Sequence, residues 1–429
     1  MTTFLILGLL LGLIIIGMPI ALSLGVTSLV SMVMLFGMDA PVDLVAQRMY
    51  YGVNSFLLVA VPFFMLAGEI MNRSGATTRL FSFADALVGY LPGGLGHVNV
   101  ASSLIFAGMS GSAAADAAGL GAIEIKAMKE RGFPLPFSVG LTAASSTVGP
   151  MVPPSIPMIV FGVVSGTSIG GLFLAGVLPG FLMCVLLSVT VWIWGSRKGA
   201  PRSTFSTSRL FQSLKGAFLP LMTPVIVLSG IFGGLFTPTE ASVVAVIYTS
   251  VLGVFVYKEI NVNDLIEIMK KVAREIAPLM LIVATASLFG YLIIRLGLPR
   301  QLSELILSST SDPTAILFLI AFILLMVGFF METVSAIIIF TPLFMPVITA
   351  AGISPLQLGV VMVITLMVGV ITPPVGIVLF ILERVSGLPI EKVFKAVLPF
   401  FIPLTASIII LIVFPEVSTW LPKLFYGYL

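Results

Sequence analysis

Charge is scarce in this sequence of 429 residues, where Asp, Glu, Lys and Arg together make up 9%. A soluble domain carries about 25% of such residues, so these charges are too few to cover a surface that faces water. Hydrophobic residues make up 59%, and many uninterrupted apolar runs exceed the roughly 18 residues that indicate a transmembrane helix. A transmembrane barrel would instead show short segments of alternating polarity. The composition therefore predicts an all-α polytopic membrane protein.

Cysteine and histidine occur once each, which excludes several kinds of site. Cys184 is the only cysteine, so no intrachain disulfide can form, and its apolar flanks predict a buried hydrophobic side chain. His97 is the only histidine, which excludes a metal site built from several histidines. The sequence has no Walker motif, so the chain does not hydrolyse ATP itself. Without a metal cluster or a catalytic dyad, we expect no enzymatic activity and no cofactor.

Apolar runs and helix breakers divide the chain into predicted helices. The first run lacks a positively charged n-region, so we interpret it as a retained transmembrane helix and not as a signal peptide. The stretches 42–53 and 262–275 are amphipathic and are predicted to lie along the membrane surface. The predicted membrane helices cover 3–20, 22–37, 55–72, a pair at 96–130, a broken helix at 137–165, 168–195, 216–234, 240–257, 277–295, a pair at 313–350, a broken helix at 355–382, and 393–415.

The basic residues lie in loops and the net charge is only +3, which indicates membrane topology and not nucleic-acid binding. Short loops rich in Lys and Arg face the cytoplasm. Five such residues lie in the central connection, namely Arg197, Lys198, Arg202, Arg209 and Lys215. All the basic loops can face the cytoplasm if both termini are periplasmic and the pairs at 96–130 and 313–350 turn back within the membrane. The sequence therefore predicts two re-entrant hairpins.

The two halves of the chain share a pattern of helix breakers. Pro153-Pro154 and Pro373-Pro374 lie 220 positions apart (373 minus 153), inside the two predicted broken helices. At similar offsets, Gly149 recurs as Gly369, Gly108 as Gly328, Gly68 as Gly290, Arg73 as Arg295, Gly75 as Gly297 and Pro19 as Pro238. We therefore predict two repeats, 1–215 and 216–429. The topology above inverts one relative to the other, and inverted repeats with matched broken helices are typical of secondary transporters.

A break inside a membrane helix leaves backbone N–H and C=O groups unpaired, which is tolerated only where protein, water or ligand satisfies them. Helix N-termini favour anions, and C-terminal carbonyls favour cations. Hydroxyl side chains precede each break, at Ser145–Thr147 and at Thr372, and they suit Na⁺. The predicted hairpin tips, Ser110–Ser112 and Glu332–Ser335, are also polar. Asp116 and Glu332 are acids in apolar surroundings, which predicts a role in an ion or substrate site.

Four stretches together resemble a known family, namely FAGMSGSAAADAAGLGAIEIKAMKERGFP, STVGPMVPPSIPMIVFG, FTPTEASVVAVIY and GVITPPVGIVLF. They resemble the large membrane (M) subunit of tripartite ATP-independent periplasmic (TRAP) transporters, DctM/SiaM-like, essentially from end to end. The resemblance implies Na⁺-coupled import of an organic acid across the bacterial inner membrane, with a periplasmic substrate-binding protein delivering the acid. It also implies a separate four-helix small membrane subunit (Q-type). The implied fold is that of the elevator-type ion transporter superfamily, in which a transport domain slides past a scaffold.

Carried onto this chain, the resemblance implies one Na⁺ at each hairpin and break, with the substrate carboxylate between them. The first ion site would comprise Ser110, Gly111, Ser112, Ser145, Thr147 and Gly149. The second would comprise Glu332, Thr333, Gly369, Ile371 and Thr372. The substrate would contact Ser112, Asp116, Pro154, Ser155, Thr333, Ser335 and Pro373.

Two other functions stay open at this point. A stand-alone ion-coupled carboxylate carrier would need no periplasmic partner, and a channel could also use re-entrant hairpins. Between the organic acids of the family, we slightly favour sialic acid over a C4-dicarboxylate.

Overall fold

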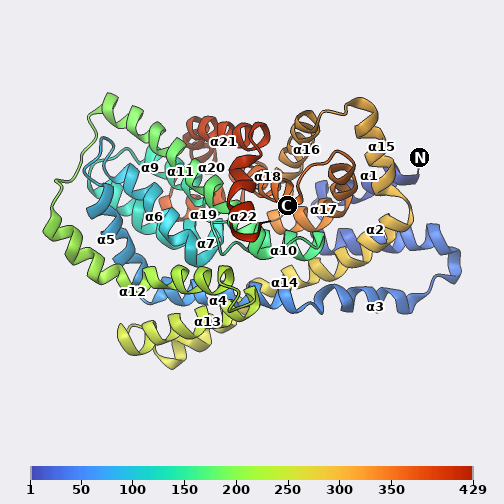
Figure 1. The fold of residues 1–429 in the computed structure, drawn as a ribbon, viewed down its shortest axis with the longest axis horizontal. Helices are drawn as coiled ribbons and strands as arrows, with labels where there is room; N and C mark the ends of the chain where they lie inside the picture. Colours follow the sequence, from blue (N-terminus) through green and yellow to red (C-terminus); the bar gives the residue numbers. More distant parts are fainter. Residues whose placement is uncertain (1, 428–429) are drawn as a thin grey trace.

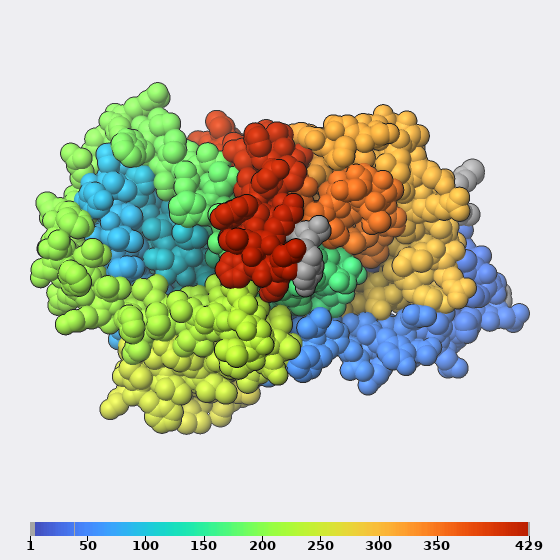
Figure 2. Space-filling model, in the orientation of Figure 1, coloured from blue at the N-terminus to red at the C-terminus, as the bar shows by residue number. Residues whose placement is uncertain are grey.

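The computed structural model describes residues 2–427, and over that range it contains helices and no strand. The predicted all-α class is therefore confirmed. In Figure 1, long helices run along the lower side of the molecule, and shorter, interrupted helices lie above them. Figure 2 shows the same face as a continuous surface, with the C-terminal segment, in red, over the middle of its upper part.

The first predicted repeat contains a hairpin and a broken helix, as expected. Its helices are α1 (Thr2–Ile15), α2 (Ile20–Phe36), η1 (Gly37–Asp39), α3 (Val42–Val53), η2 (Phe56–Val59), α4 (Ala60–Arg73), α5 (Ala76–Val88), α6 (Leu95–Ser110), α7 (Ala113–Ala118), α8 (Leu120–Glu130), α9 (Leu135–Ser146), α10 (Ile156–Ser165) and α11 (Ile169–Lys198). The hairpin is formed by α6, α7 and α8, and the broken helix by α9 and α10.

The second predicted repeat follows the same order. Its helices are α12 (Thr207–Phe232), α13 (Pro238–Val251), η3 (Leu252–Val256), α14 (Val262–Arg295), α15 (Leu298–Ser309), α16 (Pro313–Gly328), α17 (Thr333–Ala350), α18 (Pro355–Val370), α19 (Ile377–Ser386), α20 (Ile390–Val397), η4 (Leu398–Phe400), α21 (Phe401–Val413) and α22 (Glu416–Tyr426). The hairpin is α16 with α17, and the broken helix is α18 with α19. Because α12 begins at Thr207, the predicted repeat boundary at 215/216 falls within this helix.

Seven helical segments in the described part of the chain are long and apolar enough to cross a membrane. They are Phe56–Arg73, Ile169–Lys198, Thr207–Phe232, Pro238–Val256, Val262–Arg295, Thr333–Ala350 and Ile390–Val413. The hairpin limbs α6 and α16 have 16 residues each. At about 1.5 Å per residue they are roughly 24 Å long, short of the roughly 30 Å hydrocarbon core. The length of these two limbs therefore suits segments that turn back within the membrane, whereas α17, the other limb of the second hairpin, has 18 residues and is one of the seven longer segments.

The long helices pack on one another and form a body that we call the scaffold. In it, α14 packs against α2, α3 and α4, and α13 packs against α4 and α12. The predicted amphipathic stretch 262–275 and the predicted helix 277–295 are one continuous helix, α14, of 34 residues. The prediction of two separate elements was wrong because Pro278, inside α14, does not end the helix.

The C-terminal helix α22 was not predicted from the sequence, and neither were two amphipathic helices at matching positions in the two halves, α5 and α15. Each follows a glycine in the left-handed region, Gly75 (φ 68°) before α5 and Gly297 (φ 72°) before α15. Glycine adopts this conformation at little cost. The recurrence of the glycine at an offset of 222 therefore marks the same turn and the same following helix in both halves. Their mixed composition gave no long apolar run, which explains the omission.

A buried carboxylate joins three separate segments at one end of the molecule. Asp85 of α5 has a side chain that is 3% exposed. Arg131, after α8, donates to Asp85 Oδ1 (3.1 Å) and Oδ2 (2.8 Å), Ser203 donates to Oδ1 (3.1 Å), and Arg209 of α12 also pairs with it. Burial alone would raise the pKa of Asp85, but the hydrogen bonds and charges of the two arginines outweigh it and hold this pKa below its ordinary value.

Replacing this carboxylate should destabilise the fold. We expect Asp85→Ala to lower the free energy of unfolding by about 2 kcal/mol, because charge-assisted hydrogen bonds are lost. The change should be visible as a lower apparent melting temperature of the detergent-solubilised protein. Because the pKa of Asp85 is lowered in the folded protein, the Asp85 carboxylate should contribute fully to stability at pH values above the ordinary carboxyl pKa. This contribution should disappear as the pH falls through the lowered pKa of the folded state.

The matched control is Glu304→Ala, which removes the exposed Arg300–Glu304 pair (2.8 Å; side chains 86% and 64% exposed). Exposed pairs of this kind contribute little, so this variant should melt like the wild type. Equal losses in both variants would contradict the role given to Asp85.

Candidate functional site

Both hairpin tips and both helix breaks meet around one central cavity of about 170 Å³. From the first repeat, Gly111–Ala114, Pro150, Ile156 and Pro157 line it; from the second, Glu332–Val334, Met367, Val370 and Ile377; from the scaffold, Met65 and Leu279. The second half of each broken helix also packs on the other repeat's hairpin, α10 on α17 and α19 on α7. The structure thus brings the two separately predicted halves into one site.

The first hairpin tip lies directly on the first break. Gly111 has φ 57°, and a Cβ added there would lie 2.3 Å from the carbonyl oxygen of Pro154. A Cβ on Gly149 would lie 3.5 Å from the carbonyl oxygen of Ser112. The predicted residues Gly111, Ser112, Gly149 and Pro154 are therefore neighbours. Only a glycine at position 111 permits this approach of two backbones.

The hydroxyl groups around the first break are engaged as donors. Ser145 Oγ donates to Asn99 Oδ1 (2.7 Å), and Thr147 Oγ1 donates to the carbonyl of Ala144 (2.6 Å). Ser155 caps α10 by accepting a hydrogen bond from the Met158 backbone N–H (3.2 Å), and it donates to the carbonyl of Pro150. A hydroxyl that donates its hydrogen keeps lone pairs for a cation. The Ser110 hydroxyl is buried without a hydrogen-bond partner.

The second hairpin tip lies on the second break in the same way. A Cβ on Gly369 would lie 2.6 Å from the carbonyl carbon and oxygen of Gly328. The Val375 backbone N–H donates to the carbonyl of Phe329 (3.1 Å). Thr372 Oγ1 donates to the carbonyl of Val368 (2.7 Å), next to buried Ile371 and half-buried Pro373. We call each contact of a hairpin tip with the break of its own repeat a tip–break clamp.

Glu332 lines the central cavity and also has a local structural role. It caps α17, because its Oε2 accepts hydrogen bonds from the backbone N–H groups of Val334 (3.0 Å) and Ser335 (3.2 Å). The Ser335 hydroxyl, fully buried, also donates to this oxygen (3.4 Å). The neighbouring Thr333 hydroxyl is buried without a hydrogen-bond partner, and Thr333 lines the cavity. A ligand in the cavity could form a hydrogen bond with the Thr333 hydroxyl.

Of the seven predicted substrate residues, Ser112 and Thr333 line the central cavity, whereas Pro154, Ser155, Ser335 and Pro373 are not among the described residues that line it. Asp116 does not line it either. It is fully buried inside the first hairpin, where the Ser103 hydroxyl donates to its Oδ1 (3.4 Å) and its Oδ2 has no partner.

The sequence analysis missed a polar network behind the first break. Asn99 donates to Glu124 Oε2 and to Thr142 Oγ1, both at 2.7 Å, and accepts the hydrogen bond from Ser145. All four side chains are fully buried. The signal available in the sequence was Glu124, an acid inside a hairpin limb, but no role was predicted for it. The network fixes the Ser145 hydroxyl relative to the first hairpin.

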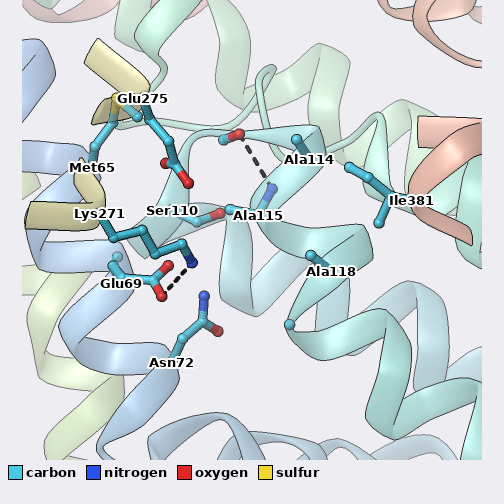
Figure 3. A pocket seen from close by; sticks show the side chains of 13 residues that line it. Met65, Glu69, Asn72, Ser110, Ala114, Ala115, Ala118, Lys271, Glu275 and Ile381 are labelled. Atoms are coloured by element: carbon cyan, nitrogen blue, oxygen red, sulfur yellow. Dashed lines mark hydrogen bonds and ion pairs between the residues drawn. The ribbon is translucent and has the colours of Figure 1, made fainter. Parts of the chain in front are cut away.

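A second cavity, of about 360 Å³, adjoins the central one between the scaffold and the first hairpin. Figure 3 shows its charged wall, where Lys271 of α14 pairs with Glu69 of α4 and Glu275 points into the same space. No sequence motif indicated this wall, because it is formed by two helices nearly 200 residues apart.

Adding one methyl group at the second clamp should separate its two backbones. We expect Gly369→Ala to lower the stability of the protein by about 1–3 kcal/mol, the usual effect of overpacking, because the Gly328 backbone cannot rotate away as a side chain could. The measurement is the apparent melting temperature of the solubilised protein. The control is Gly290→Ala in α14, where an added Cβ has nothing within 4 Å, and it should melt at or above the wild-type temperature.

The comparisons with known proteins agree with this architecture. The family model described as "Tripartite ATP-independent periplasmic transporter, DctM component" matches residues 7–417. The chain is 42% identical to the sialic acid TRAP transporter large permease protein SiaM of Vibrio cholerae, over 97% of this chain and 98% of that protein. It is 34% identical to the C4-dicarboxylate TRAP transporter large permease protein DctM of Rhodobacter capsulatus, over 99% of each.

Among solved structures, the YdaH transporter of Alcanivorax borkumensis matches with a TM-score of 0.64 and 16% identity, over 99% of this chain and 98% of that one. At this identity the likeness concerns the fold alone, and it extends over nearly the whole of both chains. The family model and the two relatives match almost the whole chain, and they therefore show its family. This chain belongs to the TRAP transporters, as their large membrane subunit, the DctM component.

Proposed function

We propose that this chain imports an organic acid by Na⁺-coupled secondary active transport with an elevator mechanism. The observation that carries the proposal is the pair of tip–break clamps around one cavity. Relatives named for sialic acid and for C4-dicarboxylates support the substrate class, and the greater identity to the sialic acid protein favours a sialic acid.

Each clamp supplies the chemistry of a Na⁺ site. A break exposes carbonyl oxygens at the C-terminal end of its first half-helix, where the helix dipole is negative. Hydroxyl lone pairs from Ser145 and Thr147 at the first break, and from Thr372 at the second, add hard oxygen ligands of the kind that bind such cations. The Ser112 carbonyl beside Gly149, and the carbonyls near Gly369, complete candidate ligand sets.

The substrate carboxylate would lie in the central cavity, between the two clamps. The N-terminal ends of α10 and α17 border this cavity, and helix N-termini favour anions. The unpartnered Thr333 hydroxyl is available to donate to it. An ion bound at either clamp would fix the geometry of the tip that touches the substrate, which couples the two binding events.

The division into a scaffold of long helices and a body of short, interrupted ones supports the elevator mechanism. The body would carry hairpins, breaks and cavity together, while α4 and α14 stay fixed. With the basic loops cytoplasmic, the wider cavity beside Lys271 opens on the cytoplasmic half, so this conformation faces inward. Both termini would then be periplasmic and the protein would lie in the bacterial inner membrane, with a four-helix small subunit and a periplasmic binding protein as partners.

Reconstitution tests the coupling directly. We expect proteoliposomes that contain this chain with its small subunit, in the presence of the cognate binding protein, to accumulate N-acetylneuraminate only under an inward Na⁺ gradient. Replacing Na⁺ with K⁺ should abolish accumulation. Uptake that persists in K⁺ would contradict the coupling, and uptake without the binding protein would favour a stand-alone carrier. Flux at near-diffusional rates without accumulation would indicate a channel.

The proposed Na⁺ site at the second clamp can be tested by removing the hydroxyl group of Thr372. Thr372→Val should raise the Na⁺ concentration for half-maximal uptake by roughly tenfold, because one cation ligand worth about 1.4 kcal/mol is lost. Thr349→Val is the control, since Thr349 of α17 makes the same bond to a carbonyl four residues back (2.8 Å) but is exposed. Wild-type Na⁺ dependence in Thr372→Val would remove Thr372 from the ion site.

A further inference from the structure

The wider cavity adjoins the central one and shares its lining at Met65, Ser112 and Ala114. One wall belongs to the scaffold, with Glu69 and Asn72 of α4 and Lys271 and Glu275 of α14. The opposite wall belongs to the first hairpin and is built of small residues, Ala114, Ala115, Ala118 and Gly119. A solute leaving the central cavity on this side must pass between the two walls.

Three hydrogen-bond donors face this cavity (Figure 3). The Lys271 ammonium has three N–H donors, and it lies 2.5 Å from Glu69 Oε1. The Asn72 side chain accepts from Thr77 through its oxygen (3.3 Å), which leaves its amide hydrogens for the cavity. Ser110 is 3% exposed, lines the cavity and has no hydrogen-bond partner for its hydroxyl.

The charges along the two cavities are unequal. Lys271 is the one cationic residue among the described residues that line them, whereas Glu69, Glu275 and Glu332 are acids. Within these two cavities, a dicarboxylate would place its second negative charge near these acids without a cation of its own, which is unfavourable. Three further cations, Arg73, Lys270 and Arg274, line a neighbouring cavity and not these two. A monocarboxylate with several hydroxyl groups would use the single cation for its carboxylate and donate its hydroxyl hydrogens to the acids.

We propose that this cavity is a second binding site for the transported acid, on the side where it leaves the central cavity, and that it is selective for hydroxylated monocarboxylates. The inference rests on the proposed function. The substrate carboxylate displaces Glu69 from Lys271, while Asn72 and Ser110 donate to the remaining oxygens. Because the two walls belong to different bodies, the site exists only while the first hairpin lies against α4 and α14.

Glu69 and the substrate carboxylate compete for the Lys271 ammonium. Substitutions of the two partners of this ion pair should therefore change the affinity for the substrate in opposite directions. Lys271→Gln should weaken binding by roughly three- to tenfold, the value of a charge-assisted hydrogen bond discounted for the half-exposed lysine. Glu69→Gln should strengthen it by about two- to threefold, because the competitor is gone. An ion pair that merely ties α4 to α14 would give losses in both variants.

The experiment uses the purified chain with its small subunit in nanodiscs, titrated calorimetrically with N-acetylneuraminate in K⁺ buffer without Na⁺. Without Na⁺ the central site should be empty, so binding reports the second site. Succinate, titrated in parallel, should bind at least fivefold more weakly. The control is Lys270→Gln, which removes the same charge from the adjacent position of α14. Lys270 does not line this cavity but lines a neighbouring one that shares Lys271 and Glu275, so its loss should weaken binding less than Lys271→Gln does.

The outcomes separate this inference from the proposed function. Absence of Na⁺-independent binding in the wild type, weakening in both Glu69→Gln and Lys271→Gln, or no effect of Lys271→Gln would each overturn the second site. Equal affinity for succinate would overturn its selectivity for monocarboxylates. Na⁺-driven uptake that persists in any of these cases would leave the proposed function standing, and loss of that uptake in the wild type would remove both.

Discussion

An unpaired backbone amide in hydrocarbon costs several kcal/mol, and the rest of this structure depends on how two helix breaks escape that cost. Each break is covered by the hairpin tip of its own repeat, through Gly111 on Pro154 in one half and Gly328 on Gly369 in the other. The carbonyls that the tips do not reach are those that the proposed ions would contact. The same constraint that makes a broken helix costly therefore places polar backbone beside a cavity.

The breaks, hairpins and repeats could be predicted from the sequence, because prolines and glycines interrupt otherwise apolar runs and recur at nearly constant offsets between the two halves. The helices α5 and α15 were missed, since an amphipathic helix of about 12 residues leaves no such run. Glu332 was predicted as a site acid, and its capping bonds to α17 could also have been inferred from its position before Thr333. The charged wall at Glu69 and Lys271 could not, because it depends on how α4 packs against α14.

The scaffold and the hairpin body meet across surfaces of very different chemistry. The hairpin offers only small side chains, whereas the scaffold offers an ion pair and an amide; the hairpin residues are Ser110, Ser112, Ala114, Ala115, Ala118 and Gly119. In the proposed elevator mechanism, a surface of small side chains would move past the scaffold with little repacking. The Glu69–Lys271 ion pair would stay intact during this motion, because both residues belong to the scaffold.

The two clamps also differ in how they hold their geometry. Behind the first break, Asn99 joins Glu124, Thr142 and Ser145 into a buried network at 2.7 Å contacts. The second hairpin has no such network, since α16 is apolar along almost its whole length, and its clamp rests on the Gly328–Gly369 contact and one backbone hydrogen bond. One oxygen of this network, Glu124 Oε1, is buried without a hydrogen-bond partner, so the network is not fully satisfied. The first break is thus held to its hairpin by directed side-chain hydrogen bonds, whereas the second is held by close backbone packing.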